Sequence, residues 1–334
     1  MKIGLISLAH PHGLSYLMSL KSLPDAEITG IADDDEARVR HWAEQFGIPY
    51  DGELLGVPFV GDYRELLKQD IDAVIVTSEN AKHREHVLAA ARAGKHVLCE
   101  KPLATNAKDA QEMIDVCQEN GVLLSTAFPV RFCTSVATAK QVVESGQLGQ
   151  IYAIKSTNHG TIPGDWFVDR VLAGGGAVTD HTVHLVDVMR WMMGAEVATV
   201  YAESNTRFGD DPIDDCGIVT IEFDNGVFAT IDCSWSRSSK SYPTWGDVTM
   251  EILGSDGILH VDAFNQKVNV YSDTLGTKWE NWGDNMDAGL IADFVASVRE
   301  GRQPLVSGLD GLRATEVVEA AYEAIRLKQT VALR

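Results

Sequence analysis

Two hydrophobic patterns alternate over roughly the first 125 residues. Nearly continuous runs of β-branched residues and leucine have the length of strands: Lys2–Leu8, Glu27–Asp33, Ala73–Ser78, Lys95–Glu100 and Val122–Phe128. Between them lie segments with apolar residues three or four positions apart: Gly13–Leu23, Asp35–Phe46, Ala81–Ala93 and Ala107–Asn120. Apolar strands that alternate with helices predict a parallel sheet covered on both faces. Right-handed crossovers make such a sheet doubly wound.

The pattern changes after about residue 130. A helix is predicted at Thr134–Ser145, before strands of alternating polarity: Ile151–Thr157, Val197–Asn205, Gly217–Phe223 and Val227–Ser236. Hairpin turns are predicted at Asp224–Gly226 and at Gly254–Gly257, the latter between Val248–Leu253 and Ile258–Asp262. Further helices are expected near Ala177–Met193, Asp287–Glu300 and Leu309–Leu327. The predicted class is α/β: a doubly wound, Rossmann-type domain (1–125), then an α+β domain (126–334) with a large, mostly antiparallel open sheet.

Composition narrows the possible partners. The chain of 334 residues has 28 Lys and Arg against 48 Asp and Glu, a formal net charge of −20. This deficit of cations argues against nucleic acid and anionic membranes as partners. No apolar run approaches the ~20 residues of a membrane span, and the first apolar stretch is interpreted as a strand rather than a signal peptide. The five scattered cysteines suggest reduced thiols and a cytoplasmic protein.

The turn after the first strand is a candidate phosphate-binding turn. The glycines of a G-x-G-x-x-G fingerprint would fall on Ser7, Ala9 and His12, so the motif is degenerate. Ser and Ala are small enough for close approach of a diphosphate, but His12 does not replace a packing glycine. An ordinary strand–turn–helix explains the turn equally. Metal binding by His10 and His12 is the weaker interpretation, and no metal is expected.

Asp33, at the end of the second strand, is the candidate ribose-binding carboxylate. It follows Gly13 by about 20 residues, the spacing typical of dinucleotide-binding folds. A carboxylate there accepts hydrogen bonds from ribose hydroxyls and repels a 2′-phosphate. No arginine is expected nearby to bind such a phosphate, so NAD is favoured over NADP. A turn or helix cap is the alternative role for Asp33.

Glu100-Lys101-Pro102 follows a strand directly, which places Lys101 at the edge where open α/β sheets bind ligands. A lysine there can polarise a substrate oxygen. The alternative is an ordinary lysine in a surface loop.

Three glycines, Gly174–Gly176, precede a predicted helix in which Asp180 and His184 are spaced i, i+4. Residues so spaced share a helix face, and a carboxylate can orient an imidazole for acid–base catalysis. An amphipathic helix whose histidine bonds a neighbour explains the pair equally. The acidic run Asp210–Asp215 is interpreted as a solvated loop rather than a cation site.

These motifs together resemble the Gfo/Idh/MocA oxidoreductases, which include glucose–fructose oxidoreductase and inositol dehydrogenases. The resemblance rests on Asp72–Thr77, Asn80–His83, Ala93–Ala104 and Leu148–Ile151, and on the glycine run with Asp180, His184 and Asp187. It extends over nearly the whole chain.

The resemblance implies an NAD(P)-dependent dehydrogenase that oxidises a secondary hydroxyl of a sugar, cyclitol or sugar derivative between its two domains. The first domain (1–125) would bind NAD(P), and the second (126–334) would serve substrate binding and oligomerisation. His184 would be the general base, Lys101 would hydrogen-bond the reacting oxygen, and Asp180 would hold His184 or a substrate hydroxyl. Two departures from the family pattern are the degenerate glycine turn and Glu79, where the usual residue is proline beside the nicotinamide edge. The residues expected to bind the cofactor are Ser7, Ala9, His10, His12, Gly13, Asp33, Thr77, Ser78, Asn80, His83, Glu100 and Lys101.

Arg131, Trp166 and Arg170 are further substrate-side candidates, with Lys101, Asp180 and His184. A homodimer or homotetramer is expected. The alternatives are an NAD-dependent glycosidase acting by oxidation and elimination, and a non-catalytic regulator that senses a sugar or dinucleotide.

Overall fold

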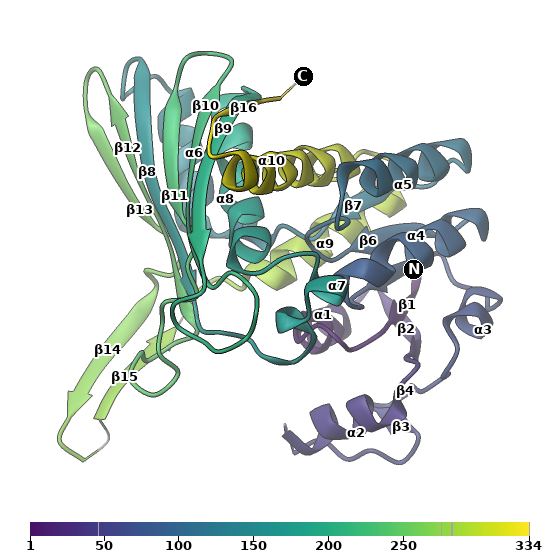
Figure 1. The fold of residues 1–334 in the computed structure, drawn as a ribbon. Coiled ribbons are helices and arrows are strands. Elements are labelled where there is room, and N and C mark those ends of the chain that lie inside the picture. The colour runs from purple at the N-terminus through teal and green to yellow at the C-terminus, as the bar shows by residue number, and fades with distance from the viewer. Residues whose placement is uncertain (46, 275, 282, 334) are drawn as a thin grey trace. The chain divides into compact units, whose positions relative to one another are not determined.

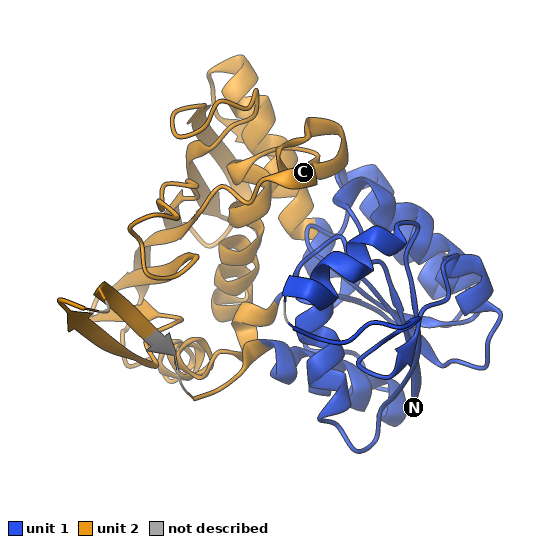
Figure 2. Ribbon diagram, turned by 90° about the horizontal axis from the view of Figure 1, so that it is seen from below, with its two compact units in different colours: residues 1–128, 287–312 blue, residues 129–286, 313–334 orange. Residues whose placement is uncertain are grey.

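The computed structural model describes residues 1–45, 47–274, 276–281 and 283–333 (Figure 1). The chain forms two compact units, residues 1–128 with 287–312 and residues 129–286 with 313–334 (Figure 2). The predicted single boundary near residue 125 therefore misses one feature. The segment 287–312 belongs to the first unit because its helical residues contact that unit. One such contact is the hydrogen bond that Ser15 Oγ donates to Asp287 Oδ2 (2.5 Å).

The first unit contains a five-stranded parallel sheet in the order β2-β1-β5-β6-β7. Its strands are β1 (Lys2–Ile6), β2 (Glu27–Ala32), β5 (Ala73–Val76), β6 (His96–Cys99) and β7 (Leu124–Thr126). The doubly wound Rossmann prediction is confirmed, with strands slightly shorter than expected. Strand β1 lies between β2 and β5, so the chain crosses to one side of β1 to form β2 and to the other side to form β5. Ligands bind such sheets at the carboxyl ends of the strands, near the position where the strand order reverses.

The predicted helices of this unit are also present. They are α1 (His12–Lys21), α2 (Glu36–Gln45), α4 (His83–Arg92) and α5 (Ala107–Glu119), with α9 (Met286–Glu300) later in the chain. Phe46, the last residue of one predicted helix, lies outside the described residues. The pattern did not reveal α3 (Tyr63–Leu67), the 3₁₀ turn η1 (Asn80–Lys82) or the small strands β3 (Glu53–Leu54) and β4 (Val57–Pro58).

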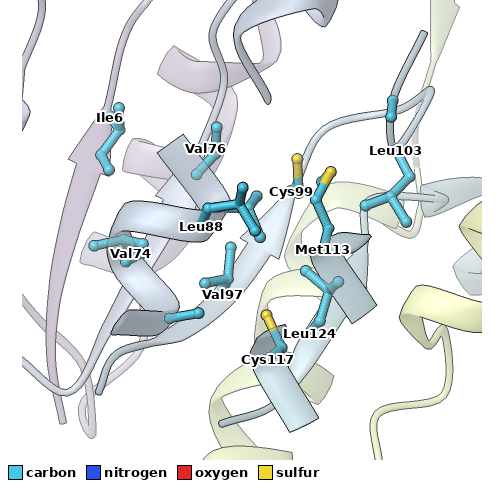
Figure 3. Close-up of a cluster of buried hydrophobic side chains, with 14 of the residues drawn as sticks. Ile6, Val74, Val76, Leu88, Val97, Cys99, Leu103, Met113, Cys117 and Leu124 are labelled. Carbon is cyan, nitrogen blue, oxygen red and sulfur yellow. The ribbon is translucent and has the colours of Figure 1, made fainter. Parts of the chain in front are cut away.

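Apolar side chains of the sheet and of its helices form one buried cluster (Figure 3). Val74 and Val97 from the sheet pack with Leu88 of α4 and Met113 of α5, and all four are almost wholly removed from water. Burial of each such side chain contributes about 1.5–3 kcal/mol. This core fixes the strand ends that carry the candidate site.

The second unit contains a seven-stranded sheet in the order β13-β12-β8-β11-β10-β9-β16, in which only β8 and β11 pair in parallel among the described residues. Its strands are β8 (Ile151–Gly160), β9 (Val197–Asn205), β10 (Cys216–Phe223), β11 (Phe228–Asp232), β12 (Gly246–Gly254), β13 (Ile258–Asp262) and β16 (Val331–Ala332). The mostly antiparallel prediction is confirmed. Both predicted hairpins are present, with Gly226 at positive φ in the first and Gly254 N–H donating to Gly257 O in the second.

Helix α8 (Ala177–Met193) packs against β8 and β10, and α6 (Thr134–Glu144) packs against α8. Helix α10 (Gly308–Leu327) continues from the first unit into the second. The remaining elements are η2 (Pro129–Phe132), η3 (Asp165–Val168), α7 (Arg170–Ala173) and the two-stranded sheet of β14 (Lys267–Ser272) and β15 (Gly276–Asn281). No helix among the described residues is long and apolar enough to cross a membrane.

Candidate active site

Ser7 takes the backbone conformation that the first fingerprint glycine normally supplies. Its φ is +71°, in a region that costs a non-glycine residue about 1–3 kcal/mol. The hydroxyl compensates, because it donates to Asp33 Oδ2 (3.1 Å) and accepts from Ala9 N–H (3.1 Å). Serine therefore replaces glycine here by exchanging backbone freedom for side-chain hydrogen bonds.

Gly13, rather than residue 12, is the packing glycine of this turn. A Cβ on Gly13 would lie 2.8 Å from Thr77 Oγ1 and 2.9 Å from Leu8 Cδ2, closer than real Cβ atoms approach. The helix therefore needs glycine one position later than the fingerprint predicts. His12, where the fingerprint would place its third glycine, begins α1 with a half-buried side chain.

The backbone donors of the turn already have acceptors. From Ser7 to Gly13 every N–H donates within the unit, and Pro11 has none. Three of these N–H groups donate to side chains, and the two longest of those hydrogen bonds measure 3.1 Å: Ala9 N to Ser7 Oγ and His12 N to His10 Nδ1. An incoming diphosphate would have to compete with such bonds, since the turn presents a closed network rather than an open cradle.

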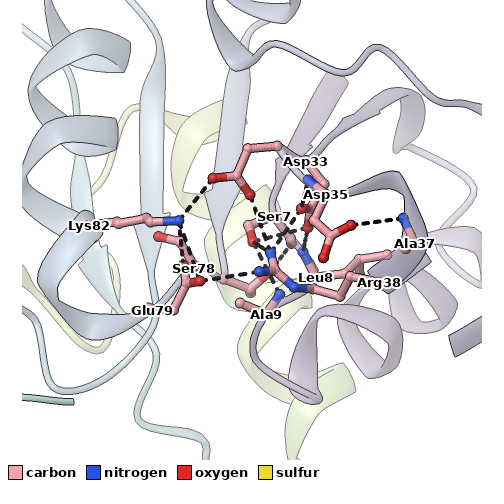
Figure 4. A network of polar contacts seen from close by, with 12 residues as sticks. Ser7, Leu8, Ala9, Asp33, Asp35, Ala37, Arg38, Ser78, Glu79 and Lys82 are labelled. Atoms are coloured by element: carbon pink, nitrogen blue, oxygen red, sulfur yellow. Dashed lines mark hydrogen bonds and ion pairs between the residues drawn. The ribbon is translucent and has the colours of Figure 1, made fainter. Parts of the chain in front are cut away.

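Asp33 is buried at the end of β2 in a dense polar network (Figure 4). Its carboxylate accepts from Leu8 N–H (2.6 Å) and Asp35 N–H (2.8 Å) and lies 2.8 Å from Arg38 Nη1. Burial raises the pKa of Asp33 and these hydrogen bonds oppose the rise. The expectation that no arginine lies nearby was wrong, because the first turn of α2 brings Arg38 next to Asp33 at the end of β2.

Glu79 joins the same network and does not stand alone. Its buried carboxylate lies 3.2 Å from Arg38 Nη2 and 3.2 Å from Lys82 Nζ, and Lys82 also contacts Asp34 (2.9 Å). Glu79, Lys82 and Asp34 line a hollow of about 510 Å³ at the ends of β1 and β2. A hollow of this size is in the range of small-ligand pockets.

The Lys101 turn is anchored by a buried carboxylate. Glu100, which is fully buried, accepts from the Tyr16 hydroxyl (2.5 Å) and from Lys101 N–H (3.0 Å), and lies 3.1 Å from His12 Nδ1. Burial opposes the ionised form, yet His10, His12 and Lys101 hold the pKa of Glu100 well below its usual range. The Lys101–Pro102 peptide bond is cis, and Lys101 is 4% exposed.

The remaining cofactor candidates line the end of β5. Thr77 Oγ1 donates to Ser7 O (2.5 Å), and Ser78 Oγ lies 2.9 Å from His86 Nδ1. The ring of His83 is wholly buried between Pro102 O and Ser78 O, and burial lowers its pKa. Asn80, also buried, begins η1. Contact of these residues with a cofactor stays a prediction.

His10, His12 and Glu100 form a compact group whose potential metal-ligating atoms lie within 4.8 Å of one another. Such a ligand set is known from zinc sites. Here, however, His10 Nδ1 accepts the His12 N–H, so a neutral His10 ring carries its proton on Nε2 and offers no free lone pair. The group as it stands is a closed hydrogen-bonded cluster.

In the second unit, the glycine run leads into α8 at a tightly packed point. A Cβ on Gly176 would lie 1.9 Å from Asp214 O, so only glycine fits. The Asp214 carboxylate accepts from Val178 N–H (2.9 Å) and from the Tyr322 hydroxyl (2.9 Å) and thereby caps the helix. The solvated-loop interpretation was wrong for Asp214 and Asp215, which are both buried.

Asp180 and His184 lie one turn apart on α8, as their spacing predicts. Asp180 Oδ2 accepts from Trp235 Nε1 (3.1 Å) and lies 3.3 Å from His181 Nε2. His184 is 9% exposed. Neither Trp235 nor His181 was expected to hold this carboxylate.

The other substrate candidates differ in their surroundings. Arg131 is buried, and its guanidinium makes two bonds to Asp187 of α8, at 2.8 and 2.5 Å. Such a bidentate pair joins η2 to α8. Trp166 is buried and stacks on Phe167, whereas Arg170 is exposed at the start of α7.

Asn158 is a candidate that sequence reasoning missed. It is wholly buried on β8, on the face toward α8, and neither its Oδ1 nor its Nδ2 has a hydrogen-bond partner among the described residues. An unpaired buried polar group costs about 1–3 kcal/mol, so this amide has the character of a binding group. No signal in the sequence pointed to it, because the predicted strand Ile151–Thr157 ends one residue before Asn158, whereas β8 extends to Gly160.

The fold and these strand-end residues define an oxidoreductase with a Rossmann-type NAD-binding domain. Residues 3–128 match the oxidoreductase family with an NAD-binding Rossmann fold, and residues 136–260 match the GFO/IDH/MocA C-terminal domain. The chain belongs to the GFO/IDH/MocA family.

The chain is 31% identical to myo-inositol 2-dehydrogenase of Thermotoga maritima, over 100% of this chain and 98% of that protein. It is 28% identical to D-xylose 1-dehydrogenase (NADP(+)) 2 of Haloferax volcanii, over 96% of each chain. Its fold is that of GenD2 from gentamicin A biosynthesis, solved in complex with NAD, with a TM-score of 0.88, 23% identity and coverage of 100% of this chain and 96% of that one.

Proposed function

We propose that this oxidoreductase is an NAD-preferring dehydrogenase of a secondary hydroxyl in a sugar, cyclitol or sugar derivative. The observation that carries the proposal is the buried Lys101, fixed at the carboxyl end of β6 by Glu100. Relatives named inositol 2-dehydrogenase and D-xylose 1-dehydrogenase support this substrate class.

The residues at the strand ends fit a dinucleotide. Gly13 permits α1 to approach the sheet, and the hollow beside Asp33 has room for an adenosine. In the proposed role, the diphosphate displaces hydrogen bonds that now close the turn and binds to Ser7, Ala9 and the N-terminus of α1, and Asp33 favours an unphosphorylated ribose. Bound NAD would supply the acceptor for the hydride that leaves the carbinol carbon.

We assign the acid–base steps to three side chains. His184 takes the hydroxyl proton as hydride leaves, a role suited to imidazole because its ordinary pKa is near ~6.5. Lys101 donates a hydrogen bond to the same oxygen and stabilises the charge that develops on it. Asp180, held by Trp235, orients His184 or a substrate hydroxyl.

The substrate contacts proposed beside these are Asn158, Trp166 and Arg170. In this role the Asn158 amide, which has no hydrogen-bond partner among the described residues, would form hydrogen bonds to hydroxyl groups of a polyol. Arg131 stays a predicted substrate residue, although its pair with Asp187 supports a role in positioning α8.

We further propose a homodimer or homotetramer through the face of the second sheet opposite α8. Ile218, Phe228 and Ile258 lie on that face and are each more than half exposed. Exposed apolar side chains on an uncovered sheet face are typical of an interface. The five free thiols support a reducing, cytoplasmic location.

A substrate screen tests the proposal. The full chain is incubated with sugars, inositols and sugar acids, each with NAD or NADP, and reduced nicotinamide is followed by absorbance. We expect NADH formation with at least one polyol and slower NADPH formation. Glycoside cleavage without accumulation of NADH would instead support the glycosidase alternative, and binding without turnover of any substrate class would support a regulator.

A further inference from the structure

Three carboxylates and two cations form a polar network at the end of β2 (Figure 4), and four of these five residues line the hollow beside it. The cations are Arg38 and Lys82, and the carboxylates are Asp33, Asp34 and Glu79. The formal charge of this group is −1, since three negative charges face two positive ones. Both cations are therefore already neutralised before any ligand arrives.

The three carboxylates differ in what holds them. Asp33 accepts backbone N–H groups from Leu8 and Asp35, so its position depends little on the cations. The side chain of Asp34 is 67% exposed, so water screens its charge.

Glu79 is the carboxylate that bridges the two cations. Its side chain is 6% exposed, with Oε1 3.2 Å from Arg38 Nη2 and Oε2 3.2 Å from Lys82 Nζ. Charge interactions are stronger in such a dry position than at the surface. Asp33 lies closer to Arg38 (2.8 Å), and the exposed Asp34 lies closer to Lys82 (2.9 Å). Of the three carboxylates, Glu79 is the buried one that contacts both cations.

A cofactor with a ribose 2′-phosphate needs cations at the end of the second strand, and arginine normally supplies them. Arg38 and Lys82 stand at that position but are paired. We propose that Glu79 is a specificity-determining residue: its carboxylate holds Arg38 and Lys82 in ion pairs, withholds them from a 2′-phosphate and biases the site toward NAD. The inference rests on the proposed dinucleotide function of this hollow.

Binding of the reduced cofactors tests this directly and needs no substrate. NADH and NADPH are titrated into the full chain and followed by nicotinamide fluorescence, for the wild type and for Glu79→Gln. We expect the variant to bind NADPH about tenfold more tightly, because Arg38 and Lys82 each lose a buried carboxylate partner and become more available to the phosphate, and to bind NADH within about threefold of the wild type.

Glu85→Gln is the matched control. Glu85 lines the same hollow but pairs with Arg64 and Tyr63, away from Arg38 and Lys82. The Glu85→Gln substitution removes one negative charge by the same chemical change as Glu79→Gln, and we expect it to leave the ratio of NADPH affinity to NADH affinity unchanged. An equal shift in both variants would reduce the effect to net charge and overturn the role of Glu79.

A second substitution identifies the cation. In the Glu79→Gln background, Arg38→Gln should erase most of the gain in NADPH affinity. An unchanged ratio in Glu79→Gln itself would overturn the inference. Should that variant not fold, Asp34→Asn carries the test, because this exposed residue contacts the same two cations: a two- to threefold gain for NADPH supports the inference, and no gain counts against it.

The wild type separates this inference from the proposed function. If it binds neither NADH nor NADPH, the dinucleotide proposal itself fails. If it binds either one and the ratio does not respond to Glu79→Gln, only the specificity role of Glu79 is lost.

Discussion

The ring of His83 lies 2.9 Å from the carbonyl oxygen of Pro102 and so connects α4 to the turn that carries Lys101. Its other nitrogen faces Ser78 O at 3.1 Å, and the whole side chain is buried. We expect His83→Phe to lower the free energy of unfolding by about 1–3 kcal/mol, because buried carbonyl oxygens lose a donor. Chemical denaturation of the wild type and variant measures this. His83→Gln, which keeps a donor, should lose less, and an equal loss in both would contradict the role of the hydrogen bond.

Gly13 gives a prediction about packing. An added methyl group would collide with Thr77 Oγ1 and Leu8 Cδ2, so Gly13→Ala should lower the free energy of unfolding by about 1–3 kcal/mol and weaken NADH binding. Gly257→Ala is the control, since its Cβ would meet only Leu148 Cδ2 at an ordinary 3.6 Å. Denaturation midpoints and NADH titrations check both. Similar behaviour of the two variants would mean that α1 adjusts and that Gly13 is not required.

Two substitutions of Ser7 distinguish the cost of its strained backbone from the contribution of its side-chain hydrogen bonds. Ser7→Ala keeps the unfavourable φ of +71° but loses the bonds to Asp33 and Ala9, so it should be clearly destabilised. Ser7→Gly loses the same bonds but relieves the strain, so it should stay within about 1 kcal/mol of the wild type. Thermal and chemical unfolding of the three proteins test the order. An alanine variant as stable as the glycine variant would show that strain is unimportant here.

The architecture was predictable because strand and helix periodicities are local properties. Continuous apolar runs rich in β-branched residues, such as Ala73–Val76, are typical of strands buried on both faces, and the structure confirms the parallel sheet. The return of residues 287–312 to the first unit was not predictable in this way. It depends on contacts such as that between Ser15 and Asp287, which are distant in sequence and leave no periodic signal.

The candidate site was predictable where a motif fixes a residue to a strand end, as with Lys101 and Asp33. Arg38 was missed because its approach to Asp33 depends on where α2 begins and on the direction in which that helix runs after β2. A spacing of five residues between Asp33 and Arg38 does not reveal either property. The capping role of Asp214 was missed for a similar reason. Its partner helix begins nearly forty positions earlier, so no local pattern joins the two.

Lys101 and His184 give the direct test of catalysis. Lys101→Met and His184→Asn should each lower kcat by about 10²–10⁴-fold, because His184 accepts the departing proton and Lys101 stabilises the charge that develops on the substrate oxygen. NADH binding and the unfolding midpoint should change little. Steady-state kinetics on a substrate found by the screen, with NADH titration as the control for folding, measure both effects. Unchanged turnover in either variant would remove that residue from the mechanism.

His159 predicts a pH dependence of stability that is separate from catalysis. Its ring lies 2.9 Å from Asp247 Oδ1 and 3.1 Å from Asp232 Oδ2; burial alone would lower its pKa, but these two carboxylates raise it to about 9. Because the folded pKa lies above the unfolded value of ~6.5, the stabilisation is fully present below ~6.5 and is lost as pH rises through 9. We expect the free energy of unfolding to fall by up to about 3 kcal/mol between pH 6.5 and 9.5, measured by urea denaturation. His159→Gln should be less stable at pH 6.5 and show a flatter profile, whereas a parallel decline in both proteins would assign the pH dependence to other groups.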